Sequence, residues 1–340
     1  MSLQILWFVL WGLLWAVYFM LDGFDLGAGM LYGFLGRNEA EKAAIRRSIG
    51  PVWDGNEVWV ITAGGATFAA FPAAYASLFS FLYSAFLLIL FALIFRGAAL
   101  EFRAKAQGVS WARTWDLVFC VASFFPAFLF GVAFGNLFRG LPIDASGYHG
   151  TLLGLLNPYG VLTGVLFVAL FVVHGALWVA LKTSGELGAR SLRMARELWS
   201  YILILAAGFL VASYFSTGLA ANYLKSPLWT AVPAAAVATL FASRFFIGRG
   251  RVFAAFLASG ATILLVTATG LVGLFPNLIP SRTDSAFSLT IFNSSSSPYT
   301  LKILTVVTLV FVPIVIAYQI WVYRVFRAKI DAAGGAEENY

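Results

Sequence analysis

The chain has 340 residues, of which 61% are hydrophobic and only 11% are charged, and its formal net charge is +7. An average soluble domain is about 25% charged, so this composition excludes an ordinary soluble protein and indicates a polytopic α-helical membrane protein. The positive net charge predicts basic cytoplasmic loops rather than a nucleic-acid partner.

Nine segments are apolar enough and long enough to cross a membrane, which takes about 20 mostly apolar residues. They cover approximately residues 5–35, 54–76, 78–98, 115–138, 157–181, 199–221, 228–246, 252–275 and 303–327. We therefore expect an all-α fold with nine transmembrane helices, arranged as two four-helix bundles plus one peripheral helix. Residues 1–340 are expected to form a single integral membrane domain, with long extracytoplasmic loops at about 139–156 and 276–302.

Basic residues orient these segments. Of the 22 lysines and arginines, 18 fall after the first, third, fifth and seventh segments or at the C-terminal end. The connection after the third segment is assigned Arg96, Arg103, Lys105 and Arg113. The opposite side holds only Arg139, Lys225, Arg282 and Lys302. Because basic residues favour cytoplasmic loops, this bias predicts an N-terminus outside the cell and a cytoplasmic C-terminus.

The first segment carries two acids, Asp22 and Asp25, in the stretch MLDGFDLGAG. A carboxylate at the centre of a membrane helix costs about 2.5–3.5 kcal/mol, so both side chains are expected to face protein or water, or to be protonated. They are three residues apart and share one helix face. Gly23 and Gly27 form a small-xxx-small pair that allows another helix backbone to approach closely.

The second segment begins with another pair of acids at the same spacing, Asp54 and Glu57. Four carboxylates therefore converge if the first two segments pack as antiparallel neighbours. One interpretation is a proton relay or a cation site. The other is structural, because Asp54 is suitably placed to cap the second helix and Asp22 could be a hydrogen-bonded structural acid.

Other candidate chemistry is sparse. Asp116 is expected to be a cap or a snorkelling acid at an interface. His174 lies in the fifth segment, where a packing or hydrogen-bonding role is favoured over haem ligation. The sequence has no zinc-ligand spacing, nucleotide-binding loop or nucleophile elbow, so we assign no catalytic residue and no metal ligand.

Several motifs are distributed along the chain: LDGFDLGAGML, FLGRNEAEK, IGPVWDGNEVWVITAGGATFAAFP, GVAFGN, NPYGVLTG and SLTIFNSSSSPYTLKI. Together they resemble subunit II of the cytochrome bd-type quinol oxidases. The resemblance extends from about residue 15 to residue 327, and the order of the motifs also fits. One departure is His174, which stands where a glutamine-like residue is expected.

The resemblance implies a multi-pass subunit of the bacterial cell (inner) membrane. Its complex oxidises quinol, reduces dioxygen to water, and takes the chemical protons from the cytoplasm. Haems b and d would be held by subunit I, an obligate partner, and this chain would bind none. The resemblance leaves open a quinone bound within subunit II and a small single-span accessory subunit.

The resemblance also gives the acids a role. Asp25 and Asp54 match the carboxylates proposed to admit protons in the family, and we add Asp22 and Glu57 to the expected proton pathway. The alternative from the residues alone is a cation- or proton-coupled secondary transporter that uses the same carboxylates.

Overall fold

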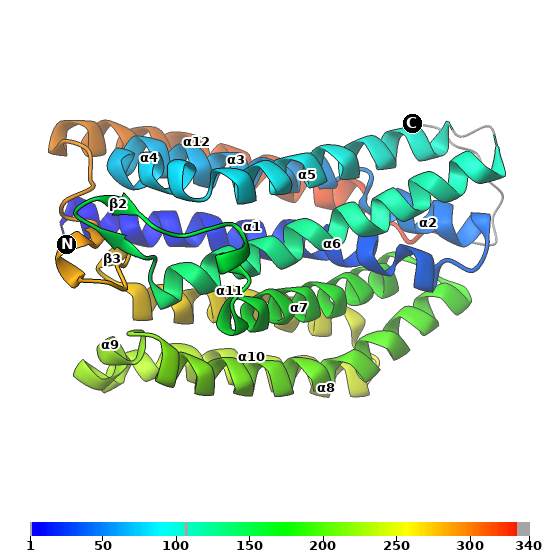
Figure 1. Cartoon of the computed structure of the whole chain (residues 1–340). Helices are drawn as coiled ribbons and strands as arrows, with labels where there is room; N and C mark the ends of the chain where they lie inside the picture. The colour runs from blue at the N-terminus through cyan, green and yellow to red at the C-terminus, as the bar shows by residue number, and fades with distance from the viewer. Residues whose placement is uncertain (1, 106–107, 332–340) are drawn as a thin grey trace.

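The computed structural model describes residues 2–105 and 108–331, which form long helices lying side by side (Figure 1). The first half of the chain forms α1 (Leu3–Leu35), α2 (Glu39–Ile49), α3 (Trp53–Ala70), α4 (Pro72–Phe81), α5 (Tyr83–Ala104) and α6 (Val109–Arg139). The second half forms α7 (Pro158–Lys182), α8 (Gly185–Ser216), α9 (Ala220–Lys225), α10 (Ala231–Gly248), α11 (Val252–Leu274) and α12 (Pro298–Val325). Within the described ranges, eight helices are long and apolar enough to cross a membrane, so an all-α membrane fold is confirmed.

The expected second segment, 54–76, is the one that differs most from a single apolar helix. Its residues form α3, which ends at Ala70, and the first part of α4. Pro72 disfavours helical geometry at the residue before it, and Phe71 accordingly has φ −135° and ψ 62°. The first turns of α3 also carry Asp54, Asn56 and Glu57, which lower its apolar character.

The expected third segment is longer than 78–98. Leu82 separates α4 from α5, yet the Phe86 N–H still donates to the Leu82 carbonyl at 2.9 Å. The two helices therefore continue one another from Pro72 to Ala104. This extension places Arg96 inside a helix and not in a loop, which corrects its assignment from the sequence.

The central helix is α1, which packs against α3, α6, α7 and α11. The helices α7, α8, α10 and α11 form a four-helix group, while α6 packs against both α1 and α7 and α5 packs against α6 (Figure 1). The outermost helix is α12, in which Leu301 is the one buried residue. This arrangement resembles two bundles with a peripheral helix.

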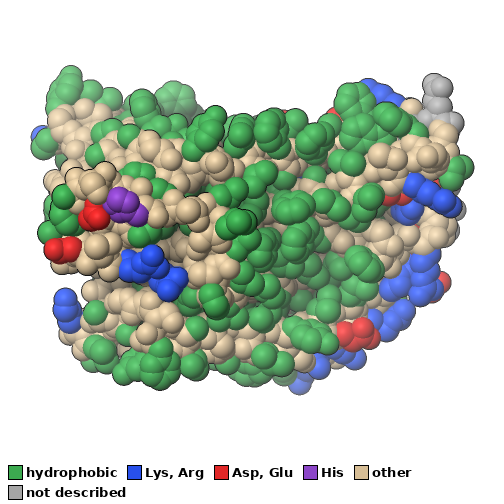
Figure 2. All heavy atoms as spheres, in the orientation of Figure 1, with side chains coloured by type: hydrophobic (Ala, Val, Ile, Leu, Met, Phe, Trp, Pro, Cys, Tyr) green, Lys and Arg blue, Asp and Glu red, His purple; other side chains and the backbone are tan. Residues whose placement is uncertain are grey.

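The two long interhelical segments meet at the end of the bundle where α1 begins (Figure 1). One contains the hairpin of β1 (Ile143–Asp144) and β2 (Gly147–Tyr148), and the other contains β3 (Asn277–Ile279) and β4 (Leu289–Thr290). They are joined where the Leu141 N–H donates to the Pro280 carbonyl at 2.8 Å. Figure 2 shows a broad hydrophobic middle and a gathering of lysine and arginine at the other end of the molecule.

Candidate functional site

Glycines fix the position of α1, which carries the two intramembrane aspartates. A Cβ atom on Gly27 would overlap the carbonyl oxygen of Phe171, and one on Gly175 would overlap the backbone of Gly27 and Ala28. A Cβ on Gly23 would lie 2.8 Å from the Phe171 ring. The expected small-xxx-small contact is therefore confirmed, and α7 is the helix that it admits.

Asp22 is fully buried and forms an ion pair with an arginine from α5. Arg96 Nη1 lies 2.6 Å from Asp22 Oδ1, and Arg96 Nη2 lies 2.7 Å from Glu57 Oε2. The guanidinium therefore joins α1, α3 and α5 through two carboxylates. Sequence reasoning missed Arg96, although the apolar run around it, ILFALIFRGAAL, signals an arginine inside a span.

Asp25 is also buried, but its only hydrogen-bond partner among the described residues is an amide. Asn56 Nδ2 donates to Asp25 Oδ2 at 2.7 Å, and the Tyr323 hydroxyl donates to Asn56 Oδ1 at 2.8 Å. Asn56 is itself 1% exposed, so this chain of contacts from α12 through α3 to α1 lies inside the protein. We call Asp22, Asp25, Asn56, Glu57, Arg96 and Tyr323 the core cluster.

The core cluster contains one guanidinium for three carboxyl groups. Three of its polar atoms, Asp22 Oδ2, Asp25 Oδ1 and Arg96 Nε, are buried and have no hydrogen-bond partner among the described residues. A buried polar atom without a partner is costly, and its presence in a native protein calls for an explanation such as a chemical role or a bound water molecule.

Asp54 does not join the core cluster. It is exposed on the first turn of α3, and the α3 residue that reaches Asp25 is Asn56. The capping interpretation of Asp54 is wrong in its detail, because Val52 is the N-cap and no side chain caps this helix end. Asp54 still lies where the helix dipole favours an acid.

His174 is buried against α1 and α11. Its Nε2 lies 3.2 Å from the Met20 carbonyl oxygen, and its ring stacks on Phe256 at a centroid distance of 4.4 Å. This ring is held by packing and by a backbone contact, as the favoured sequence interpretation predicts. Nε2 faces this backbone carbonyl, and one face of the ring is covered by Phe256.

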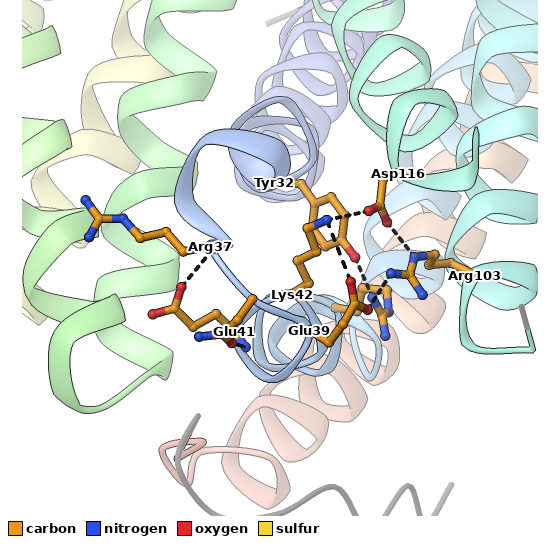
Figure 3. A network of polar contacts seen from close by, with 9 residues as sticks. Tyr32, Arg37, Glu39, Glu41, Lys42, Arg103 and Asp116 are labelled. Atoms are coloured by element: carbon orange, nitrogen blue, oxygen red, sulfur yellow. Dashed lines mark hydrogen bonds and ion pairs between the residues drawn. The ribbon is translucent and has the colours of Figure 1, made fainter. Parts of the chain in front are cut away.

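A second charged network surrounds α2, at the end of the bundle rich in basic residues (Figure 3). Asp116 accepts from Lys42 Nζ at 2.6 Å and from Arg103 Nε at 2.5 Å. Arg103 also donates to Glu39 at 2.5 Å. Asp116 lies two turns inside α6, so it is an ion-pairing residue, and its expected role as a cap or snorkelling acid is wrong.

The other side of α2 is held by Glu41. Its Oε2 accepts from Arg190 Nη2 at 2.6 Å and from the Arg37 N–H at 2.8 Å. Burial raises the pKa of this carboxyl, but the hydrogen bonds from Arg190 and Arg37 outweigh burial and hold the pKa below its ordinary value. We call Glu39, Glu41, Lys42, Arg103, Asp116 and Arg190 the α2 network, in which three acids meet three bases.

The architecture and the core cluster define a class of protein: a polytopic membrane protein with buried carboxylates. Among the described residues, no group of three or more histidine, cysteine or acidic side chains could hold a metal ion. Comparison with known proteins narrows this class. The family Cytochrome bd terminal oxidase subunit II matches residues 3–326. The chain therefore belongs to this family, and the resemblance found in the sequence is confirmed.

Two relatives are similar over nearly their whole length. Cytochrome bd ubiquinol oxidase subunit 2 of Bacillus subtilis is 37% identical, with 97% of each chain covered. Cytochrome bd-I ubiquinol oxidase subunit 2 of Escherichia coli K12 is 35% identical, with 94% of this chain and 93% of the relative covered. A chain of the bd oxidase from Geobacillus thermodenitrificans shares the fold, with a TM-score of 0.77 at 19% identity over 96% of this chain and 99% of that one.

Family membership and the eight apolar helices make the chain a multi-pass protein of the bacterial inner membrane. They favour a subunit of a terminal oxidase over the secondary transporter.

Proposed function

We propose that this chain is the second subunit of a quinol oxidase complex that reduces dioxygen to water. Its partner is subunit I, which holds haems b and d and where quinol is oxidised. This chain contributes no haem ligand. The proposal is supported by the family match and by the names of the relatives.

The proposed topology has nine membrane crossings, with the N-terminus outside and the C-terminal end in the cytoplasm. The ninth crossing is α3, whose polar first turn lies at the inner end. The gathering of lysine and arginine at the α2 end supports this orientation (Figure 2), and so does the positive-inside rule. Arg96 lies inside a helix and no longer counts as a loop residue. Without it, basic residues still strongly favour the proposed cytoplasmic side.

The chemical role proposed for this chain is to conduct protons from the cytoplasm toward its partner. Asp54 and the half-buried Glu57 are exposed enough to exchange protons with water, and Asp22 and Asp25 lie deeper. The observation that carries the proposal is the imbalance of the core cluster: three carboxyl groups share one guanidinium. A structural ion pair needs only matched charges, so the extra acid points to proton exchange.

Within this path Arg96 and Asp25 have different roles. Arg96 compensates the charges of Asp22 and Glu57 and holds both side chains in place. Asp25 has no cation within ion-pair distance among the described residues, and its Oδ1 has no partner there. It can therefore gain or lose a proton without breaking an ion pair. Water molecules joining the unpartnered oxygens of Asp22 and Asp25 would complete the route.

The test is Asp25→Asn in the purified complex. Asparagine keeps the size and the acceptor for Asn56 but cannot carry a proton. We expect quinol-driven oxygen consumption to fall by about 10- to 100-fold, with the haem absorbance unchanged. The matched control is Asp116→Asn, which neutralises a paired acid in another membrane helix and should leave turnover near wild type.

Three results would separate the parts of the proposal. Full activity in a variant carrying both Asp25→Asn and Asp54→Asn would rule out the proton pathway but leave the quinol oxidase intact. Absence of haem and of quinol oxidation in the wild-type complex would reject the oxidase itself. A haem spectrum from the isolated chain, lost on changing His174, would reject the non-haem role.

A further inference from the structure

A cavity of about 960 Å³ opens between α1, α7, α11, α12 and the residues that follow α12. Ligand pockets in proteins have volumes of about 300–1,000 Å³, so this one can take a large molecule. Wall residues on α11 and α12, such as Leu257, Ile316 and Ile320, are 45–54% exposed, so the cavity opens at the surface of the helix bundle. Tyr323, a member of the core cluster, lines this cavity, but the three carboxyl groups of the core cluster do not.

The walls of the cavity are apolar and aromatic over the part that lies deep between the helices. Phe24 and Trp178 stack at a centroid distance of 4.3 Å, and Phe256 packs against both. Met20 and Phe253 extend this surface. Such walls favour hydrocarbon over a polar solute.

The rim at the α2 end has a different chemistry. It is lined by five basic residues: Arg47, Lys182, Arg324, Arg327 and Lys329. No aspartate or glutamate is found among the described residues that line the cavity. They come from α2, α7, the end of α12 and the segment after it. Within residues 2–105 and 108–331, no ion pair is found for Arg324, Arg327 or Lys329. Arg324, Arg327 and Lys329 therefore carry positive charge at the rim that no ion pair among the described residues neutralises.

The segment after α12 is fixed against the connection between α7 and α8, which holds the rim in place. Lys182 Nζ donates to the carbonyls of Phe326 and, at 3.0 Å, Ala328. The Ile330 N–H donates to the Lys182 carbonyl at 2.7 Å, and the Ser184 N–H donates to the Ile330 carbonyl at 3.1 Å. These bonds keep Arg327 and Lys329 beside the cavity mouth.

A second cavity shows that this charge is not a general feature of the molecule. It lies between α5, α6 and residues 152–156, has a volume of about 650 Å³, and has no charged residue among its described lining. Its walls suit any lipid tail equally well. The basic rim is what distinguishes the first cavity, and it calls for an anionic group above a hydrocarbon body.

We propose that the first cavity binds one anionic phospholipid. Its acyl chains lie against the walls formed by α1, α11 and α12, and its phosphate lies among Arg324, Arg327 and Lys329. Basic pockets between membrane helices bind anionic headgroups in this way, because several positive charges close together at the membrane surface attract an anionic lipid. The lipid fills the space between the peripheral α12 and α11. It therefore stabilises the position of Tyr323, whose hydroxyl donates to Asn56.

The experiment uses the complete complex, purified in detergent and stripped of loosely held lipid. Dioleoyl phosphatidylglycerol and dioleoyl phosphatidylcholine are added separately, and native mass spectrometry counts the bound molecules. We expect one phosphatidylglycerol per complex to bind selectively. The variant R324Q/R327Q/K329Q should weaken this binding by about 100-fold, since each basic residue contributes roughly a factor of five.

Matched controls locate the site. R113Q/R193Q/R251Q removes three exposed charges that do not line the cavity, and it should bind like the wild type. Leu257→Trp narrows the first cavity and should weaken binding, whereas Val121→Trp narrows the second and should not.

Three results would overturn the proposal. One is equal retention of phosphatidylcholine. Another is unchanged phosphatidylglycerol binding in the triple rim variant or in Leu257→Trp. The third is an isoprenoid quinone occupying the cavity of the purified complex in place of phospholipid. Each readout is independent of oxidase turnover, so it does not depend on the proposed proton pathway.

Discussion

Arg96 and Arg103 lie two turns apart on α5, and each binds two carboxylates from other helices. Their surroundings differ. The side chains of Arg96 and Asp22 are 1% and 0% exposed, whereas Glu39, a partner of Arg103, is 72% exposed. Asp116 also has a second cation, Lys42, while Asp22 depends on Arg96 alone for its charge.

This comparison separates two uses of the same chemistry. The α2 network pairs each acid with a base, and part of it is exposed to water. It therefore joins α2, α5, α6 and α8 with little free-energy cost from buried charge. The core cluster has more acids than bases in the buried interior of the protein, where each unmatched charge is expensive. An excess of buried acids does not favour stability, but it allows a carboxyl group to bind and release a proton reversibly.

Arg96→Leu should give the largest effect. It leaves the buried Asp22 and the half-buried Glu57 without a cation, and breaking a buried pair such as Arg96–Asp22 in this way costs about 3–5 kcal/mol. We expect a large fall in the unfolding temperature of the complex, or loss of assembly, measured by thermal denaturation and purified yield.

A rescue variant keeps this prediction informative if Arg96→Leu fails to assemble. Adding Asp22→Asn and Glu57→Gln removes the unmatched charges and should restore much of the stability. If the triple variant is no more stable than Arg96→Leu, the loss comes from packing of the arginine side chain and not from charge.

Arg103→Gln should have a smaller effect on the same helix. Asp116 keeps Lys42, and Glu39 can return to water, so we expect a loss of about 1–2 kcal/mol. Thermal denaturation at low and high salt measures it, and the loss should shrink as salt screens the pairs. A cost equal to that of Arg96→Leu would contradict the contrast between the two networks.

Much of the helical pattern and part of the core cluster could be predicted from the sequence. Apolar segments located the helices, and the spacing of Asp22, Asp25, Gly23 and Gly27 placed the acids and the close contact on α1. These features are local, because helix periodicity alone determines which residues share a face.

What the sequence missed depends on tertiary packing. Tyr323 reaches Asn56 across 267 residues, and no local pattern selects that pair. Arg96 was counted as a loop cation because a charge at the end of an apolar run usually ends a span. Pro72 did signal the end of α3, but average hydropathy over the segment obscured it.

The α2 network should also respond to acid through Glu41. Its pKa lies below the ordinary value in the folded chain, so its ionised form contributes stability above about pH 4.3, the ordinary value for glutamate. That contribution, on the order of 1 kcal/mol, is lost as the pH falls through the lower folded value. We expect Glu41→Gln to lower the unfolding temperature at neutral pH and to match the wild type in acid. A difference that persists or grows in acid would contradict this sign.

Asp54→Asn should have the smallest effect on stability, within about 0.5 kcal/mol, because the side chain is exposed and no side-chain cap bond is lost. Its effect on turnover tests where the proton path begins. If Asp54 collects protons for Glu57 and Asp25, oxygen consumption should slow in Asp54→Asn at high pH, where protons are scarce, and recover as the pH falls. Asp25→Asn should stay slow throughout, because no supply of protons restores a carrier that has been removed. A pH profile of Asp54→Asn equal to that of the wild type would place Asp54 outside the path and leave Glu57 as its outer member.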